Sequence, residues 1–480
     1  MRRPPKPRSR ADKVSLLRYM SLFRKDILSA QPVRLYRAWM AEFRTPFFRS
    51  YLVNQPDLVK CVLKDRPDDF PKSNRIGEGL RPLLGNSVFL TNGEVWKRQR
   101  RIIDPAFEGG RLRDTFPAMW AAAEGATRRL TARDGETVEI EAETSHAAAD
   151  VIFRTLFSIP IEHDIAAQVF SEFRDYQRSQ PILNLAAFVP LPKWMPRFFR
   201  RDTRAAAASI RKLITQLTTD RLAAITAGTA PDDLATKIMT TADPQTGETF
   251  TTEEMVDQVA IFFLAGHETS ASALAWTLYL MALYPEWQEK VAEEARSFIL
   301  PGKLPPEGRP ATSPPDFSMM SKLRLSRDVF REALRLYPPV PMMVREASCP
   351  ERFRDRDIAP GSQIVLSPWH LHRHERLWDN PDDFDPGRFA TENGKTCLRE
   401  AYMPFSSGAR VCTGAGFAMV EGPLLLSHLL CHLQFELGDG PAPVPVAHLT
   451  VRSDNGIWLK VRRRSSVPCG PSSRGKPARA

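Results

Sequence analysis

The residues from Phe405 to Gly414, written FSSGARVCTG, place one cysteine in a loop bounded by glycines. Cys412 follows Gly408 by four residues and precedes Gly414 by two. Glycines at such positions indicate a tight turn or a backbone that passes close to another group. A cysteine thiolate in this setting suits a metal such as iron. The alternative is a loop that carries a buried free cysteine, and one cysteine considered alone favours it.

A second group of polar side chains lies within a long apolar segment. Thr251 and Glu254 have the spacing of a capping box, which predicts a helix that begins there and ends at Pro285. The segment is apolar nearly all round, so the helix is predicted to be buried. Glu268 costs free energy there unless it is paired or used, and Thr269 can bond to the carbonyl one turn earlier. A kinked core helix with a satisfied glutamate is the structural alternative.

Two pairs of residues have helical spacing. Trp96 and Arg100 are four residues apart and share a helix face. An indole N–H and a guanidinium together suit an anion such as a pair of carboxylates, although charge alone favours a solvated basic helix. Glu332 and Arg335 are three residues apart, which is weak evidence because most surface ion pairs contribute under about 1 kcal/mol.

Length and charge limit the classes of protein. The chain has 480 residues and 42% hydrophobic residues, enough for a sizeable core. Residues 1–10 contribute +5 and residues 461–480 contribute +6 to the net charge of +11, so residues 11–460 are formally neutral. Both ends are rich in Pro, Ser and Arg, which predicts disordered tails at 1–13 and 461–480. Plain solubilising tails explain this charge, so no specific nucleic-acid partner is expected.

Cysteine spacing and hydropathy exclude further classes. The six cysteines are scattered without CxxC pairs, which argues against zinc and iron–sulfur sites. Charged residues interrupt the apolar sequence between Val14 and Ala30, so neither a signal peptide nor a membrane span is predicted. We therefore expect no transmembrane anchor and a cytoplasmic protein. An amphipathic contact of residues 14–40 with a membrane surface stays open.

The C-terminal third is predicted to contain a hairpin, a histidine-rich strand and a helix. Ala359 to Gly361 has the composition of a hairpin turn. Ala415 to Leu433 is a long apolar segment, and the N-terminus of such a helix would stabilise a thiolate beside it. Three histidines would share one side of an extended strand, where a metal site is a weak alternative: His370, His372 and His374.

These patterns together resemble one family. The spacing Phe-x-x-Gly-x-Arg-x-Cys-x-Gly is similar to the haem-binding loop of the cytochrome P-450 family and matches it at all five fixed positions. Four further matches follow the family's order: Trp-x-x-x-Arg at Trp96, Ala-Gly-x-Glu-Thr at residues 265–269, Glu-x-x-Arg at Glu332, and a later arginine at Arg388. The resemblance covers residues 20–460.

The resemblance implies the fold and the cofactor. The fold would be mainly α-helical with a smaller β-rich part, as a single domain over residues 14–460 that binds haem b. Cys412 would be the proximal iron ligand, with Gly414 among the backbone groups that tune its sulfur. Phe405 would shield the loop side of the haem. The haem propionates would be bound by one indole and three guanidinium groups, those of Trp96, Arg100, Arg345 and Arg410. Glu332, Arg335 and Arg388 would form a buried structural cluster.

The resemblance also implies the reaction. Glu268 and Thr269 would deliver protons, and one oxygen atom of O2 would enter a hydrophobic organic substrate by hydroxylation or epoxidation. The chain ends without a flavin or iron–sulfur reductase domain, so electrons are expected from a ferredoxin or flavodoxin with its NAD(P)H-dependent reductase. The lack of an anchor favours, by analogy, a soluble bacterial-type arrangement.

The substrate pocket is predicted from three apolar stretches, at residues 66–93, 259–269 and 340–344. Their large side chains favour a lipid, terpenoid, steroid or other hydrophobic molecule: Phe89, Phe262, Phe263, Met342 and Met343. Two other functions stay open on the same fold. A peroxide-driven haem-thiolate peroxygenase or a non-oxidative isomerase is disfavoured by the presence of Glu268 and Thr269. A haem-based sensor or lipophile-binding protein would not need Thr269.

Overall fold

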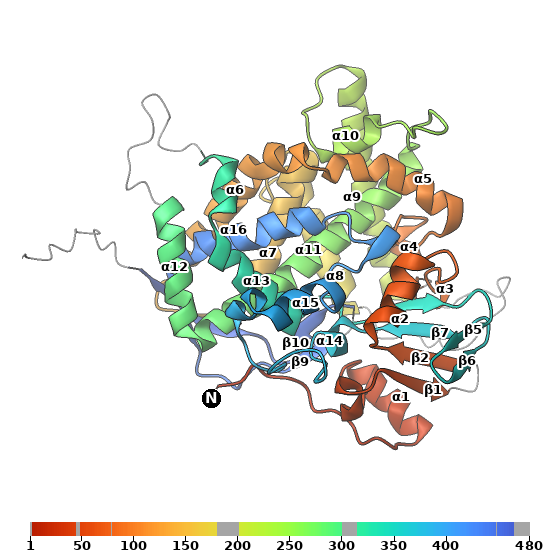
Figure 1. The fold of residues 1–480 in the computed structure, drawn as a ribbon. Helices are drawn as coiled ribbons and strands as arrows, with labels where there is room; N and C mark the ends of the chain where they lie inside the picture. The colour runs from red at the N-terminus through yellow and green to blue at the C-terminus, as the bar shows by residue number, and fades with distance from the viewer. Residues whose placement is uncertain are drawn as a thin grey trace, which may run out of the picture.

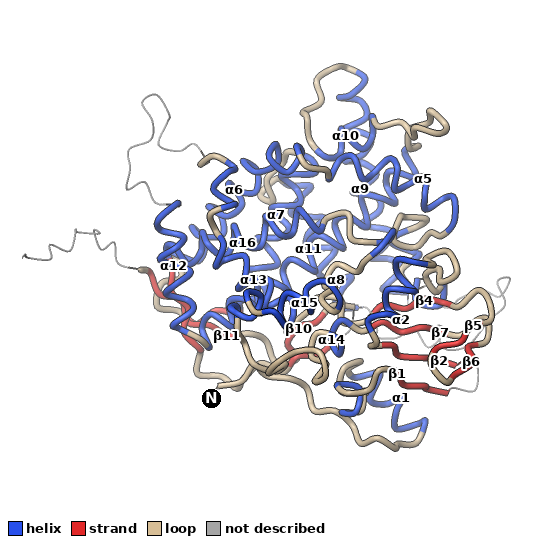
Figure 2. The backbone as a smooth tube through the Cα atoms, in the orientation of Figure 1, coloured by secondary structure: helices blue, strands red, loops and turns tan. Residues whose placement is uncertain are grey.

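The computed structural model describes residues 2–44, 49–77, 79–179, 201–299, 314–447 and 449–464. Most of it is helical, and the strands form a smaller part, as predicted (Figures 1 and 2). The helices are α1 (Leu16–Lys25), α2 (Pro56–Lys60), α3 (Asn74–Gly77), α4 (Arg81–Leu84), α5 (Gly93–Ile103), α6 (Gly110–Thr131), α7 (Ile140–Phe157), α8 (Asp164–Ser179), α9 (Arg201–Thr226), α10 (Leu234–Thr240), α11 (Thr252–Leu283), α12 (Pro285–Ile299), α13 (Arg324–Leu336), α14 (Pro368–Leu371), α15 (Glu392–Glu400) and α16 (Ala415–His432).

The strands form small sheets. They are β1 (Met40–Arg44), β2 (Arg49–Val53), β3 (Thr137–Glu139), β4 (Met343–Glu346), β5 (Glu351–Phe353), β6 (Arg356–Ile358), β7 (Gln363–Leu366), β8 (Leu433–Leu437), β9 (Pro445–Ala447), β10 (Val451–Ser453) and β11 (Trp458–Arg463). The largest sheet has the order β1-β2-β7-β4, and within it only β2 and β7 are parallel. This sheet lies to one side of the helical part (Figure 2). A second sheet has the order β3-β11-β8, and β5–β6 and β9–β10 are two-stranded.

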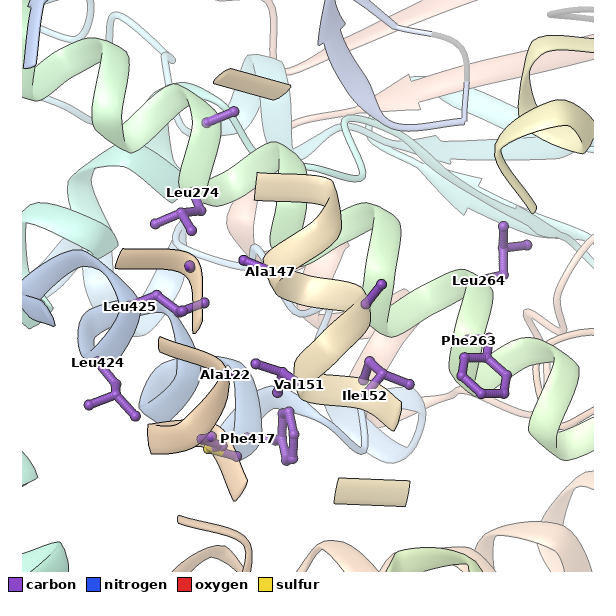
Figure 3. Packing of buried hydrophobic residues seen from close by; sticks show 14 of the residues in the cluster. Ala122, Ala147, Val151, Ile152, Phe263, Leu264, Leu274, Phe417, Leu424 and Leu425 are labelled. Atoms are coloured by element: carbon purple, nitrogen blue, oxygen red, sulfur yellow. The ribbon is translucent and has the colours of Figure 1, made fainter. Parts of the chain in front are cut away.

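The central helix is α11, with 32 residues. Its N-terminus has the predicted capping box, because Thr251 Oγ1 accepts from Glu254 N–H while the Glu254 carboxylate accepts from Thr251 N–H. Its side chains meet those of α7 and α16 in the core, with labelled residues from all three helices in Figure 3. The prediction of a buried helix is confirmed, and the site described below is built along it.

A buried ion cluster fixes α13 against the segment before the cysteine loop. The Glu332 carboxylate accepts hydrogen bonds from Arg335 Nε at 2.8 Å and from Arg388 Nε at 2.9 Å. The remaining guanidinium N–H groups of Arg335 donate to backbone carbonyls, including that of His372 at 2.8 Å, and to the second Glu332 oxygen. His372 Nε2 in turn accepts from Met403 N–H at 2.9 Å. The predicted structural cluster is therefore confirmed, and it reaches the start of the loop that carries the cysteine.

The predicted hairpin turn is misplaced. β5 and β6 form the hairpin, and their turn is at Arg354 and Asp355. Arg354 adopts the left-handed conformation that this tight turn requires, with φ of 57°. Gly361, with φ of 81°, instead turns the chain from β6 into β7, which pairs with β2 and β4.

The predicted histidine-rich strand is also wrong, because α14 begins at Pro368. Proline at the first position of a helix is favourable, and the Ser367 hydroxyl caps this one. The three histidines consequently have separate partners: Ser367 for His370, the Met403 N–H for His372, and the ring of Trp39 for His374. Within the described ranges, no cluster of metal-ligating side chains is found.

The N-terminal segment lies against the helical part, although its composition predicts disorder. Lys6 Nζ lies 2.6 Å from Asp382, and Tyr337 Oη donates to the carbonyl of Pro5 at 2.8 Å. These partners lie more than 300 residues further along the chain, so composition could not reveal them. At the other end β11 runs to Arg463, and residues 465–480 of the predicted C-terminal tail lie outside the described residues.

None of the described helices combines the length and the apolar character needed to cross a bilayer.

Candidate functional site

One large cavity, of about 1800 Å³, lies where the predicted site residues meet. Its walls come from α11, the cysteine loop and the start of α16, α5, β4 and the segment before α5. All nine predicted site residues line it: Trp96, Arg100, Glu268, Thr269, Arg345, Phe405, Arg410, Cys412 and Gly414. The fold therefore brings together residues that lie between positions 96 and 414 of the chain. From the sequence, only the family resemblance predicted that they would meet.

The cysteine loop is held by backbone contacts. Cys412 N–H donates to the Phe405 carbonyl at 2.9 Å, which closes the loop. Gly408 has φ of 71°, and a Cβ there would lie 1.9 Å from the carbonyl oxygen of Leu63. Only glycine fits this approach to the segment 61–65. Gly414 directly precedes the first residue of α16, Ala415, so the helix begins three residues after the cysteine.

The side chain of Cys412 is exposed to the cavity. The protein around this cavity still desolvates the thiol, which raises its pKa. The N–H of Gly414, and then the positive charges of Arg100 and Lys72, act in the opposite direction on that pKa. A donor N–H and nearby cations favour the thiolate, which is the form that ligates a metal.

Two arginines beside the loop are held in different ways. Arg410 lies over the ring of Trp96, with 4.0 Å from its guanidinium carbon to the ring centroid. It also donates to the Thr91 carbonyl and to Asn92 Oδ1. Arg100 pairs with Asp104 at 2.9 Å and donates to the Val411 carbonyl at 2.7 Å. Both arginines are therefore fixed on the cavity wall next to Cys412.

Arg345 is the most isolated of these cations. Its side chain is buried, and its guanidinium group donates a hydrogen bond to the carbonyl of Val344 at 3.3 Å. Desolvation lowers the pKa of Arg345 to about 10, and desolvation together with Arg345 and Arg100 lowers that of Arg410 to about 10. In the described ranges neither guanidinium has a carboxylate within salt-bridge distance. Buried cations of this kind require an anion, and none of the described residues provides one.

Lys72 is a fourth cation that sequence analysis missed. It forms an isolated β-bridge with Arg345, and its Nζ donates to the carbonyl of Phe89 at 2.8 Å. Desolvation, followed by the charges of Arg410, Arg345 and Arg100, lowers its pKa well below the usual value. A lysine within a loop-like, Pro- and Gly-rich stretch gives no sequence pattern that would have identified it.

The two predicted proton-handling residues, Glu268 and Thr269, lie on α11 and line the same cavity as Cys412. Thr269 Oγ1 donates to the Ala265 carbonyl at 2.6 Å, as the sequence suggested. Glu268 is buried and accepts from Thr450 Oγ1 at 2.7 Å and from Arg452 at 3.1 Å. Thr450 and Arg452 were missed because they lie 182 or more residues away, and nothing in their sequence marks them.

Gly266 has a packing role that its sequence context did not show. A Cβ at this position would lie 2.4 Å from Ile152 Cδ1 of α7. The glycine thus lets α7 approach α11, and Ile152 itself lines the cavity. An apolar side chain therefore lies on the cavity wall beside Gly266.

Apolar residues of the stretch 66–93, including Phe89, line the cavity. Hydrogen bonds to α11 hold this stretch in place. Asp257 accepts from Asn86 N–H at 2.7 Å and pairs with Arg211 of α9 at 2.7 Å. A Cβ at Gly85 would lie 2.1 Å from the Asp257 carboxylate, so glycine is needed there.

The predicted pocket residues are mostly placed correctly. Phe89, Phe262, Met342 and Met343 line the cavity. Phe263 does not, because it belongs to the buried hydrophobic cluster (Figure 3). Its ring centroid lies 4.5 Å from that of Phe153. Successive residues of a helix point in different directions, so only one of two adjacent phenylalanines reaches the cavity.

This donor set fits haem b. A cysteine thiolate suits an iron ligand, the glycines keep the loop backbone close, and the unpaired cations suit two propionate carboxylates. The apolar wall beyond them suits both the porphyrin and a hydrophobic substrate.

Comparisons with known proteins agree with this interpretation. The family model described as Cytochrome P450 matches residues 42–460. Human Cytochrome P450 4A11 is 31% identical over 440 residues, covering 86% of this chain and 79% of that protein. Cyclooctat-9-en-7-ol 5-monooxygenase of Streptomyces melanosporofaciens is 31% identical over 396 residues, covering 81% and 80%. Cytokinin hydroxylase of Arabidopsis thaliana is 27% identical over 414 residues, covering 85% and 78%.

A solved structure supports the fold. The crystal structure of the cytochrome P450DA heme domain is similar with a TM-score of 0.76 and 23% identity, covering 96% of this chain and 98% of that one. Because the family model spans most of the chain and relatives above 30% identity share it, this protein belongs to the cytochrome P450 family and is a haem-dependent monooxygenase.

Proposed function

We propose specific roles for the cavity residues in this monooxygenation. Cys412 would bind the haem iron through its sulfur, and Phe405 would shield the loop side of the haem. The Gly414 N–H would stabilise negative charge on the sulfur. Haem, when bound, supplies the redox chemistry with O2. The propionates would be held by one indole and four cationic groups on the cavity wall: Trp96, Arg100, Arg345, Arg410 and Lys72.

Glu268 and Thr269 would transfer protons from solvent to the cavity. The Thr269 hydroxyl donates to Ala265, so its oxygen is left to accept from water in the cavity. Glu268 is held by Thr450 and by Arg452, which is 44% exposed. We propose that Glu268 exchanges protons with solvent on the Arg452 side and passes them towards Thr269.

The observation that carries this proposal is one cavity that brings together a thiol, an α11 hydroxyl and cations without carboxylate partners among the described residues. The test is Cys412→Ser, which we expect to abolish the thiolate-type spectrum of the reduced carbonyl complex. Persistence of that spectrum would contradict the ligand assignment. Thr269→Ala should keep the spectrum but divert oxygen consumption from product to peroxide, by roughly 10²-fold if the general acid–base contribution is typical. Unchanged coupling would disprove the proton role.

Electrons are proposed to come from a ferredoxin or flavodoxin with its NAD(P)H-dependent reductase. Such donors are acidic, and α5 carries basic residues beside the cysteine loop, among them the half-buried Lys97. Reduction should slow as salt rises, and Lys97→Glu should slow it further at low salt. Turnover with peroxide alone, and none with reductant and donor, would favour the peroxygenase alternative.

The substrate is proposed to be a hydrophobic organic molecule, because Phe89, Phe262, Met342 and Met343 line the cavity. A screen for substrate-induced shifts in the haem spectrum tests this. A cytoplasmic location is proposed as well, because the five described cysteines are free thiols, a state typical of a reducing compartment.

A further inference from the structure

An ion pair between α9 and α11 also holds the short helix α4 and the turn that follows it. Arg211 Nη1 of α9 donates to one carboxylate oxygen of Asp257 on α11 at 2.7 Å. The other oxygen of that carboxylate accepts from the Asn86 N–H at 2.7 Å. Arg211 Nη1 also donates to the carbonyl of Leu83 in α4 at 3.0 Å. One guanidinium and one carboxylate therefore hold both sides of the turn at residues 83–86.

Residues 80–90, here called the wall segment, separate the cavity from solvent. Leu80, Val88, Phe89 and Leu90 line the cavity. Asn86 does not line it, yet its side chain is exposed, so this residue lies on the solvent side of the wall. Cavity-lining and solvent-facing residues are thus two positions apart, and the wall is one stretch of chain thick at this point.

The wall segment is attached to its neighbours through side chains. Besides the bond from Asn86 N–H to Asp257, the Val88 N–H donates to Gln258 Oε1 at 2.9 Å, and Gln99 Nε2 donates to the Asn86 carbonyl at 2.7 Å. Side-chain acceptors can rotate without breaking a helix or a sheet ladder. Displacement of the wall segment therefore costs few hydrogen bonds, which is typical of segments that open locally.

The two ion pairs of α9 differ in how firmly they are held. Arg221 and Asp233 are 8% and 5% exposed, and Arg221 also donates to Thr236 Oγ1 at 2.8 Å and to the Phe157 carbonyl at 2.7 Å. Arg211 lies ten residues earlier, about 15 Å along the helix. Its side chain is 25% exposed, so water can solvate the guanidinium when it separates from Asp257. The Arg221 end of α9 is thus fixed, and the Arg211 end is the one that can move.

We propose that Arg211 and Asp257 form a gating pair that closes an entrance to the cavity through the wall segment and thereby discriminates ligands by size. With the pair formed, α9 holds the turn at residues 83–86 against α11. When Arg211 separates, Asp257 keeps its bond to the Asn86 N–H, and the turn moves without the restraint from α9. Neither Arg211 nor Asp257 lines the cavity, so both are positioning residues that act on ligands through the wall segment. The proposal requires only that haem occupies the cavity, and it is independent of the roles proposed for Glu268 and Thr269.

Amide hydrogen exchange of the holoenzyme detects the opening without turnover. Arg211→Gln keeps a hydrogen-bond donor but removes the charge, and we expect exchange of amides 83–88 to rise by roughly tenfold while that of α5 is unchanged. Arg111→Gln is the matched control, because Arg111 is 27% exposed, pairs with Asp232 at 2.8 Å and does not line the cavity. Equal exchange of amides 83–88 in the two variants would overturn the proposal.

Two ligands of different size test the entrance itself. Imidazole and 4-phenylimidazole both bind ferric haem iron through a ring nitrogen and shift its absorption spectrum, so stopped-flow spectroscopy follows their entry and exit. Arg211→Gln should raise the association and dissociation rates of 4-phenylimidazole by roughly tenfold, and should change its Kd and the rates of imidazole by less than about twofold. Equal acceleration of both ligands would show a change at the haem and contradict gating. An unchanged association rate of 4-phenylimidazole would also contradict it.

Further variants show whether the two residues act as one unit. Asp257→Asn keeps an acceptor for Asn86 and should match Arg211→Gln, and the double variant should be no faster than either, because both remove the same interaction. Multiplied effects in the double variant would overturn the gating pair. Arg211→Lys retains a cation and should give intermediate rates, and it decides the test if Arg211→Gln does not retain haem. The carbonyl-complex spectrum should stay of the thiolate type throughout, so a failure of the Cys412 assignment is detected separately.

Discussion

Two clusters of buried arginines in this protein differ in what neutralises them. Around Glu332, the guanidinium groups of Arg335 and Arg388 share one carboxylate, and their remaining N–H groups meet backbone carbonyls. On the cavity wall, Arg345 and Arg410 have no carboxylate within salt-bridge distance in the described ranges, and Lys72 adds a third positive charge. The first cluster is neutralised by its own glutamate, and we propose that the haem propionates neutralise the second.

The comparison teaches how to distinguish structural from functional arginines. Sequence spacing made Glu332 and Arg335 look like a common surface pair and made Trp96 and Arg100 look like a basic helix. Burial with full pairing identifies the former as structural. Near Trp96 and Arg100, the two cations Arg345 and Arg410 have no carboxylate partner among the described residues, and this supports a site for an acidic ligand group there.

Breaking the complete cluster should have the largest effect. Glu332→Ala leaves Arg335 and Arg388 buried without a counterion, and we expect a loss of about 3–5 kcal/mol of unfolding free energy. Urea unfolding of the protein with and without haem measures it. Glu392→Ala is the control, because Glu392 and its partner Lys395 are both exposed. Equal effects of the two variants would contradict the difference between the clusters.

The same substitution in each cluster should separate stability from haem retention. Arg388→Leu should lower stability with or without haem, because Glu332 loses a partner. Arg345→Leu should leave the stability of the haem-free protein unchanged or raised, since it removes a desolvated charge among like charges. It should nevertheless speed haem loss by roughly tenfold, the equivalent of about 1.4 kcal/mol in a charge-assisted hydrogen bond. Transfer of haem to a scavenging protein measures this rate.

The incomplete cluster should also respond to pH. The pKa of Lys72 in the folded, haem-free protein is lowered well below its usual value of 10.5. The unfolded chain therefore binds more protons than the folded one between these two values, and Lys72 makes the haem-free protein gain stability as pH rises through that window. Propionates should restore the charge, so haem binding should take up a fraction of a proton and weaken as pH rises. Proton uptake in weak buffer measures this, and Lys72→Met should remove it.

The smallest effect is expected at the margin of the complete cluster. Lys6 pairs with Asp382, and the carbonyl of the next residue, Asp383, binds Arg335. Both partners of the Lys6 pair are about one third exposed, so Lys6→Ala should cost under about 1 kcal/mol. A loss as large as that of Glu332→Ala would show that the N-terminal segment is an integral part of the cluster.

Much of the site could be anticipated because its residues are close in sequence to a recognisable spacing. The Cys412 loop, the Thr251 capping box and the buried α11 all follow from local patterns, and each has the predicted boundaries within a few residues. Phe263 was misassigned because adjacent helix positions differ in direction and sequence does not say which faces the cavity. Lys72 and Arg452 were missed because their partners are distant in the chain.

By itself the sequence determined which groups can do chemistry: one cysteine between glycines in an arginine-bearing loop, an acid and an alcohol on an apolar helix, and a tryptophan–arginine pair. Those choices are local, because they depend on side-chain type and on spacing within a turn or two. Only the tertiary structure decided that Gly408 must be glycine to meet Leu63, that Glu268 is held by Thr450 and Arg452, and that Glu421 is buried against Ser270. These outcomes depend on desolvation and on contacts between distant segments, which no spacing within the chain encodes.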